Sequence, residues 1–156
     1  MRKVLLLVIG FIFTISSFVF AYDKELAKRL DMMFSPLTPE VLAKDPGLVN
    51  ATQLLQMIQN KEPFVMLDVR TPEEMAIVGI TWKDRLEIPM HELFKEENLN
   101  KLPKDKKIVV ICHTGTRAFP VALALRALGF MNAYSLEGGI VKLAEQAGRQ
   151  TYKFLH

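Results

Sequence analysis

The chain has 156 residues, enough for one domain, and half of them are apolar while about a quarter are charged. This balance excludes a disordered or collagen-like chain. The net charge is only +3 and no run of lysine or arginine is present, so nothing indicates a nucleic-acid partner. Cys112 is the only cysteine, which excludes an internal disulfide and a zinc site made of cysteines alone.

Residues 1–21 have the pattern of a secretory signal peptide. Arg2 and Lys3 precede an apolar run from Val4 to Phe20, and Ala21 is a small residue of the kind that signal peptidase reads. We therefore expect cleavage after Ala21, export to a bacterial periplasm, and a remaining chain with a net charge of +1. The alternative is a retained membrane anchor, which would make the membrane a partner, although the run is at the short limit for spanning.

Residues 22–48 predict a helical N-terminal extension. Asp23 can cap a helix that carries Leu26 and Leu30 on one side, and Pro39 suits the first turn of a second helix. We expect these helices to pack on the domain, because a single amphipathic face normally marks core packing. The alternative is a docking surface for a partner or a membrane.

Residues 49–148 alternate between helix and strand signals, and residues 149–156 form a C-terminal tail. This alternation predicts an α/β domain with a central parallel sheet and helices on both faces. In such sheets, functional sites lie at the carboxyl ends of the strands. Asn50 with Gln53, and Thr71 with Glu74, form capping boxes that predict helix starts. Further predicted helices occupy 90–97, 139–146 and 117–128, the last ending at Gly129. The predicted strands occupy 64–67, 133–136 and the β-branched run 107–111.

Cys112 directly follows a buried strand and opens a loop that leads into a helix. Gly115 allows the loop to curl so that its backbone N–H groups face inward and hold an anion. A thiol in such a cradle ionises readily. Arg117 can bind an oxyanion with two parallel hydrogen bonds, while Thr114 and Thr116 offer hydroxyl donors. The loop therefore predicts a nucleophilic sulfur beside a site for an oxyanionic substrate, and not a cysteine that merely fills the core.

Three stretches resemble motifs of the rhodanese-like family. They are Leu67–Glu74, Cys112–Ala118 and Leu136–Ile140, and they occur in the order and spacing of that family. The resemblance is to single-domain members and runs from Val49 to Gly148. Two departures are the absence of the family's histidine around Val78–Ile80 and a leucine, Leu143, where many members carry tryptophan.

The resemblance implies sulfur transfer. Cys112 would take the outer sulfur of a donor such as thiosulfate as a persulfide and pass it to cyanide, a small thiol or a protein acceptor. The backbone from His113 to Arg117 would cradle that persulfide, and Arg117 would steer the anionic donor. Asp68 and Arg70 would support the loop, with a solvated ion pair at the end of a strand as the alternative. No metal or other cofactor is implied.

The segment Thr81–Arg85 is longer than in typical members of the family. In related folds this segment lies near the mouth of the active site, so Trp82, Lys83 and Arg85 could shape substrate entry. We favour the alternative in which Trp82 packs over the sheet, because a large aromatic side chain is usually mostly buried.

Three other functions are less well supported. Phosphatases and arsenate reductase-like enzymes use a loop with five residues between cysteine and arginine, whereas four separate Cys112 and Arg117. A thiol-disulfide oxidoreductase needs a second, resolving cysteine. A non-catalytic rhodanese-like binding module often lacks the loop cysteine. His113 adjoins Cys112 and should point away from it, and His91 and His156 have no metal-ligand spacing.

Overall fold

The structure, a computed structural model, describes residues 22–45 and 47–150. The predicted signal peptide and residues 151–156 of the predicted tail lie outside these ranges. Within them, no helix is both long and apolar enough to cross a membrane.

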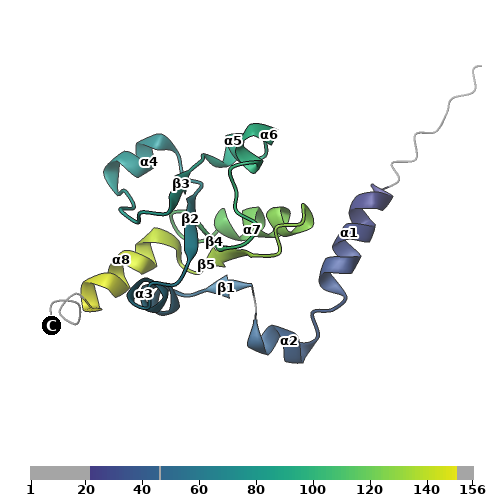
Figure 1. Ribbon diagram of the computed structural model, residues 1–156, viewed down its shortest axis with the longest axis horizontal. Coiled ribbons are helices and arrows are strands. Elements are labelled where there is room, and N and C mark those ends of the chain that lie inside the picture. The colour runs from purple at the N-terminus through teal and green to yellow at the C-terminus, as the bar shows by residue number, and fades with distance from the viewer. Residues whose placement is uncertain (1–21, 46, 151–156) are drawn as a thin grey trace, which may run out of the picture.

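Five parallel strands form one sheet in the order β1-β5-β4-β2-β3 (Figure 1). The central strand, β4, carries β-branched residues that are buried on both faces, as expected for a strand covered by helices on both sides. The predicted parallel sheet is therefore confirmed. The strands are β1 (Leu48–Val49), β2 (Phe64–Asp68), β3 (Arg85–Glu87), β4 (Lys107–Ile111) and β5 (Ala133–Leu136).

Helices cover both faces of this sheet, and alternate residues of β4 point to the two sides. Ile108 and Val110 pack in one cluster with residues of α5, α6 and α7, and Val109 and Ile111 pack in the other with residues of α3 and α8. The fold class predicted from the sequence is thus confirmed. The helices are α1 (Lys24–Phe34), α2 (Pro39–Lys44), α3 (Ala51–Gln59), α4 (Pro72–Ile77), α5 (Met90–Leu93), α6 (Glu96–Leu99), α7 (Ala118–Ala127) and α8 (Gly139–Gln150).

Both predicted capping boxes are formed. The Asn50 side chain accepts from the N–H of Gln53 at 2.9 Å, and the Gln53 side chain accepts from the N–H of Asn50 at 2.9 Å. Thr71 and Glu74 make the same reciprocal pair at the start of α4. These bonds satisfy N–H groups that a helix start otherwise leaves without partners, so both helices begin where the sequence predicts.

Three element predictions are wrong or incomplete. The predicted helix 90–97 is two single turns, α5 and α6, because Lys95 is extended and interrupts the helix. Strands β1 and β3 were not predicted, since they have only 2 and 3 residues and are too short to show a period of two. Helix α8 continues to Gln150, beyond the expected end at 146.

Trp82 packs over the sheet and does not line the mouth of the site. Its ring stacks on Phe64 with 4.9 Å between ring centroids, and its Nε1 donates to the Phe64 carbonyl at 3.3 Å. Phe64 begins β2, so Trp82 lies at the amino end of the strand. Cys112 lies at the opposite edge, which removes Trp82 from the list of groups that could shape substrate entry.

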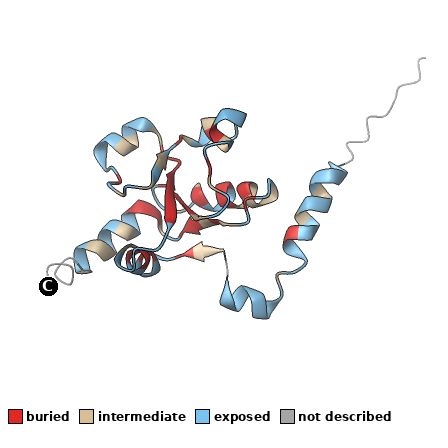
Figure 2. Ribbon diagram, viewed as in Figure 1, coloured by how far each residue is buried: buried red, intermediate tan, exposed pale blue. Residues whose placement is uncertain are grey.

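The N-terminal extension packs on the domain through α1. Helix α1 contacts α7 and buries Met33, whereas α2 buries no residue (Figure 2). A second attachment follows α2, where the Tyr134 hydroxyl donates to an oxygen of Asp45 at 2.8 Å. The expected packing of the extension is therefore confirmed for α1.

Candidate active site

All three family-like motifs meet at the carboxyl edge of the sheet. The parallel register places Asp68, the last residue of β2, beside Ile111, the last residue of β4. Val110 of β4 is likewise paired with Ser135 of β5. The chain segments that leave these strands are therefore neighbours, as expected for a site at the carboxyl ends of parallel strands.

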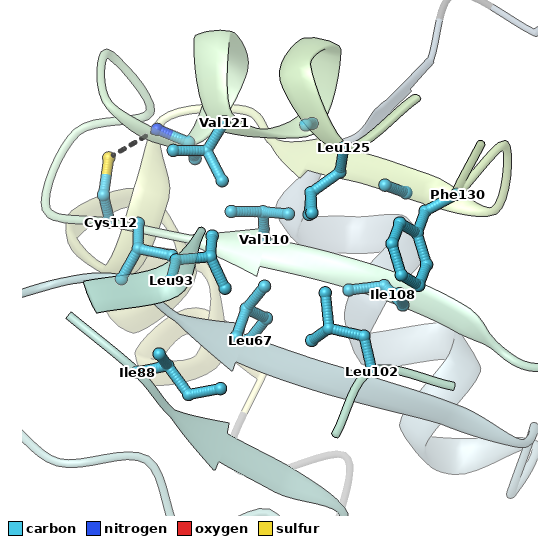
Figure 3. Packing of buried hydrophobic residues seen from close by; sticks show 14 residues of the cluster. Leu67, Ile88, Leu93, Leu102, Ile108, Val110, Cys112, Val121, Leu125 and Phe130 are labelled. Carbon is cyan, nitrogen blue, oxygen red and sulfur yellow. Dashed lines mark hydrogen bonds between the residues drawn. The ribbon is translucent and has the colours of Figure 1, made fainter. Parts of the chain in front are cut away.

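The sulfur of Cys112 lies at the base of the loop between β4 and α7. Two backbone N–H groups point at it: that of Gly115, at 3.1 Å, and that of Ala118, at 3.3 Å. Figure 3 shows the side chain at one end of the core cluster that lies beneath α7, with its sulfur toward the start of that helix. Gly115 has a φ of +93°, which only glycine adopts at little cost, and this turn brings its N–H over the sulfur.

Helix α8 holds the other side of the loop. Its Ile140 N–H donates to the Cys112 carbonyl at 2.9 Å, and its Val141 N–H donates to the His113 carbonyl at 3.2 Å. Gly139 makes this approach possible, because a Cβ atom there would collide with both carbonyls. The third motif therefore serves to bring the start of a helix against the backbone of the cysteine loop.

Arg117 is bound by the carboxylate of Glu74, a residue that the sequence predicts only as part of the cap of a helix. Its Nη1 donates to Glu74 Oε2 at 2.8 Å and its Nη2 donates to Glu74 Oε1 at 2.5 Å. Hydrogen bonds from Arg117, and then from the Thr71 N–H, lower the pKa of Glu74 from its ordinary 4.5 to about 2. The signal that could have identified Glu74 was its place at the end of the first motif, one helical turn into α4.

The pKa of Arg117 is raised by the same pair. Its hydrogen bonds to Glu74 contribute most, burial opposes them, and the charges of Glu74 and then Cys112 add smaller contributions in the same direction. The sequence predicts that Arg117 binds an anionic substrate. In the structure each of its two terminal nitrogens donates one hydrogen bond to Glu74, which anchors the loop to α4, and anion binding by Arg117 stays a prediction.

Asp68 and Arg70 form a buried pair, which excludes the alternative of a solvated one. Arg70 Nε lies 3.0 Å from Asp68 Oδ1, Arg70 Nη2 lies 2.7 Å from Asp68 Oδ2, and both side chains are 1% exposed. Arg70 Nη2 also donates to the Val78 carbonyl at 2.7 Å, just after α4. The pair thus fixes the chain around α4, the helix that supplies Glu74 to the loop.

The remaining loop side chains face outward. His113, Thr114 and Thr116 are exposed, and the two threonine hydroxyls lie 3.3 Å apart. Of the other histidines, His91 is exposed beside Glu92 and His156 lies outside the described residues. Among the described residues, no group of three or more His, Cys, Asp or Glu side chains is arranged to hold a metal ion.

These features define an α/β protein with one buried cysteine, whose sulfur is held by backbone N–H groups at the carboxyl edge of a parallel sheet. The chain belongs to the rhodanese-like domain family, whose sequence model matches residues 50–146. A sulfurtransferase of Allochromatium vinosum is 30% identical over 96 residues, which are 62% of this chain and 86% of that protein.

Two further similarities bear on the same region. The probable adenylyltransferase/sulfurtransferase MoeZ of Mycobacterium tuberculosis is 34% identical over 98 residues, which are 63% of this chain and only 24% of that protein. A rhodanese-related protein of Thermoplasma volcanium, a crystal structure, superposes with a TM-score of 0.55 at 33% identity. That match covers 64% of this chain and 91% of the other. The extension before residue 50 lies outside the family match.

Proposed function

We propose that the protein is a sulfurtransferase that carries a sulfane sulfur on Cys112. The observation that carries this proposal is the pair of N–H groups, from Gly115 and Ala118, that point at the Cys112 sulfur. Donors in this position stabilise the negative sulfur of a thiolate and of a persulfide. The sulfurtransferase named among the relatives supports the same class of reaction.

The reaction proceeds in two displacements. The Cys112 thiolate attacks the outer sulfur of a donor such as thiosulfate, a new sulfur–sulfur bond forms, and sulfite leaves with the electron pair of the bond that breaks. An acceptor such as cyanide then attacks the outer sulfur, and the electron pair of the broken bond returns to Cys112 as thiolate. Thiocyanate is the product, and no external oxidant or reductant is consumed.

Arg117 acts in this scheme as the anchor of the loop, and His113 to Thr116 supply the backbone around the persulfide. Glu74 accepts from both terminal nitrogens of Arg117 and so fixes the orientation of the guanidinium, and only four residues separate Cys112 from Arg117, one fewer than in the loops that surround a tetrahedral oxyanion. This argues against a phosphatase or arsenate reductase. The buried pair of Asp68 and Arg70 maintains the position of α4 and so supports the anchor indirectly.

Intact-mass measurement tests the proposal. Incubation with thiosulfate should add the mass of one sulfur to the protein, cyanide should remove it with release of thiocyanate, and Cys112→Ala should abolish both events. Met131→Ser is the matched control, because Met131 is exposed in the turn before β5, at the edge of the sheet opposite to the cysteine loop. Absence of a sulfur adduct with any sulfane donor would instead favour a non-catalytic binding module.

We also propose that the protein acts after export, on the basis of the pattern in residues 1–21. Cleavage after Ala21 predicts a mature chain that begins at Tyr22 in the periplasmic fraction. N-terminal sequencing of the fractionated protein tests this prediction. An intact N-terminus in the membrane fraction would support the retained anchor instead.

A further inference from the structure

The Cys112 side chain is closed off from solvent in this structure. The residue is 0% exposed, and it belongs to the core cluster beneath α7 (Figure 3). The loop that follows it carries exposed residues and directs two backbone N–H groups at the sulfur. A sulfur donor must contact this sulfur to react with it. Part of the structure therefore has to move before the first displacement proposed above can occur.

Backbone contacts hold the loop at two places. At its start, α8 donates two N–H groups to the carbonyls of Cys112 and His113. At its middle, Gly115 lies against the backbone before α8, since a Cβ atom there would be 3.1 Å from the Gly138 nitrogen and 3.2 Å from the Leu136 carbonyl oxygen. Backbone groups packed this closely leave the first half of the loop little room to move.

The far end of the loop is attached differently, by the ion pair between Arg117 and Glu74. The two side chains are 34% and 31% exposed, so solvent reaches the pair. An ion pair of this kind opens at small cost, because water replaces the interactions that it loses. Of these attachments, the one at Arg117 is therefore the most easily released.

Arg117 also interacts with the sulfur side chain itself. The pKa of Arg117 is raised first by its hydrogen bonds to Glu74, and then further by the charge of Cys112 and a hydrogen bond with Cys112. The next residue, Ala118, directs its N–H at the same sulfur. The Arg117 side chain thus links the sulfur to α4, and a guanidinium that leaves Glu74 can also leave the sulfur.

Glu74 is the fixed member of the pair. Its carboxylate also accepts from the Thr71 N–H at 3.0 Å, in the capping box at the start of α4. Just after α4, the Val78 carbonyl accepts from Arg70, which is itself held in a buried ion pair. Both ends of this short helix are therefore held. Opening of the pair is a movement of Arg117 away from α4.

We infer that the ion pair of Arg117 and Glu74 is a latch over the Cys112 thiol, and that Glu74 sets how often a sulfur donor can reach the sulfur. The inference rests on the proposed sulfur transfer and adds a step before its first displacement. In the closed state Glu74 holds Arg117 beside the sulfur. In the open state Arg117 turns into solvent and the donor contacts the thiolate. Glu74 is thus a positioning residue, which acts on the site through Arg117.

Alkylation by iodoacetamide measures this access. Cys112 is the only cysteine, so intact mass follows its reaction, with Cys112→Ala as the blank. The rate is measured with rising pH until it reaches a plateau, because the plateau reports access to the thiolate whereas the midpoint reports ionisation of the thiol. We expect Glu74→Gln to raise the plateau about threefold, the change that loss of a solvent-exposed ion pair produces.

Glu145→Gln is the matched control. Glu145 forms half-exposed ion pairs with Lys142 and Arg149 within α8 and not with the loop, so its replacement should leave the plateau unchanged. Salt provides a second measurement, since iodoacetamide is neutral while the latch is an ion pair. Raising sodium chloride from about 0.05 M to about 1 M should raise the plateau of the unmodified protein about twofold and leave that of Glu74→Gln constant. A plateau that responds to neither Glu74→Gln nor salt would overturn the inference.

Low concentrations of urea distinguish opening of the latch from unfolding of the whole domain. A local opening exposes little surface, so its frequency hardly depends on urea, whereas global unfolding increases steeply with urea. We expect the plateau rates of the unmodified protein and of Glu74→Gln to stay constant up to about 1 M urea. Alkylation rates that follow the global unfolding equilibrium would overturn the inference, because access would then not require the latch.

The latch and the proposed reaction can fail separately, because alkylation does not use sulfur transfer. A plateau that rises in Glu74→Gln, together with no sulfur adduct from thiosulfate, would support the latch and contradict the proposed function. A sulfur adduct on Cys112, together with the same plateau in Glu74→Gln and the unmodified protein, would support the proposed function and overturn the latch.

Discussion

Arg117 illustrates how a charged residue of the cysteine loop can have a structural role. The cation lies near the Cys112 sulfur, yet both of its terminal nitrogens bond to Glu74. A bidentate pair of this kind fixes the guanidinium in one orientation. The start of α7 is thereby held against α4, and the Ala118 N–H remains directed at the sulfur.

Glu74→Gln isolates the contribution of this pair, because glutamine at the third helical position preserves the capping box with Thr71. We expect a loss of about 0.2–1 kcal/mol in the free energy of unfolding at neutral pH, the range measured for ion pairs near the surface. Urea unfolding measures this loss. Arg117→Lys keeps the charge but not the two-pronged geometry and should lose a similar amount, whereas an unchanged midpoint in both variants would contradict the anchoring role.

The acid range provides a second test of the same pair. The pKa of Glu74 is about 2 in the folded protein and 4.5 is its ordinary value, so the folded state binds the proton less readily than the unfolded state does. The stabilisation from Glu74 is therefore complete above pH 4.5 and is lost as the pH falls toward 2. Unfolding curves of the unmodified protein and Glu74→Gln should converge over this interval. A stability difference that stays constant from pH 6 to about 2.5 would show that Glu74 does not titrate as described.

At the scale of elements, the site depends on how the start of α8 meets the cysteine loop. Gly139 has a φ of +59° and its Cα lies close to the carbonyls of Cys112 and His113. Any side chain there must push the loop backbone away from α8. The two hydrogen bonds from Ile140 and Val141 would be lost with that displacement.

Gly139→Ala is therefore expected to impair persulfide formation by at least about tenfold and to destabilise the fold by about 1–3 kcal/mol, as strain at a left-handed position does. Gly148→Ala is the control in the same helix: a Cβ atom there meets nothing within 4 Å, so the change should be neutral or stabilise by up to about 1 kcal/mol. The rate of sulfur loading by intact mass and thermal unfolding measure the two effects. Full activity in Gly139→Ala would show that α8 does not position the loop.

The elements that the sequence predicted correctly are those with strong local signals. The run of β-branched residues in β4, the two capping boxes and the glycine after α7 identified strands and helix ends without tertiary information. Strands β1 and β3 carry no such signal in their own residues. They are strands because β1 pairs with β5 and β3 pairs with β2. The break between α5 and α6 also has no signal in the hydrophobic pattern. It is bridged by a side-chain contact, in which the Asn98 amide donates to the Glu92 carbonyl.

The site was predictable to the extent that its chemistry lies in one segment. Cys112 and the glycine-bearing loop after it were identified from adjacent residues. The partner of Arg117 was not, because Glu74 lies 43 positions earlier in the chain and only the sheet register brings α4 beside the loop. The burial of Asp68 and Arg70 likewise depends on neighbours that no local pattern specifies.

At the scale of the whole molecule, the extension and the domain are attached by few contacts. Met33 is the only buried residue of α1, and α2 has none (Figure 2). Both core clusters are built entirely from residues that follow the extension, beginning with Val49. The domain should therefore remain folded when α1 is released, since stability is not uniform along a chain and weakly packed segments open separately.

Met33→Ser tests this separation. Loss of the buried side chain should release α1 from α7 and increase tryptic cleavage after Lys44 about tenfold, because that segment then opens more often. The domain should keep its thermal transition and its sulfur loading, since neither the sheet nor the cysteine loop uses Met33. Met32→Ser is the adjacent control, because Met32 is 59% exposed and its replacement should leave cleavage unchanged. If Met33→Ser lowered the transition of the whole domain, the extension would be part of the core, and α1 would contribute to the position of α7 and hence of Cys112.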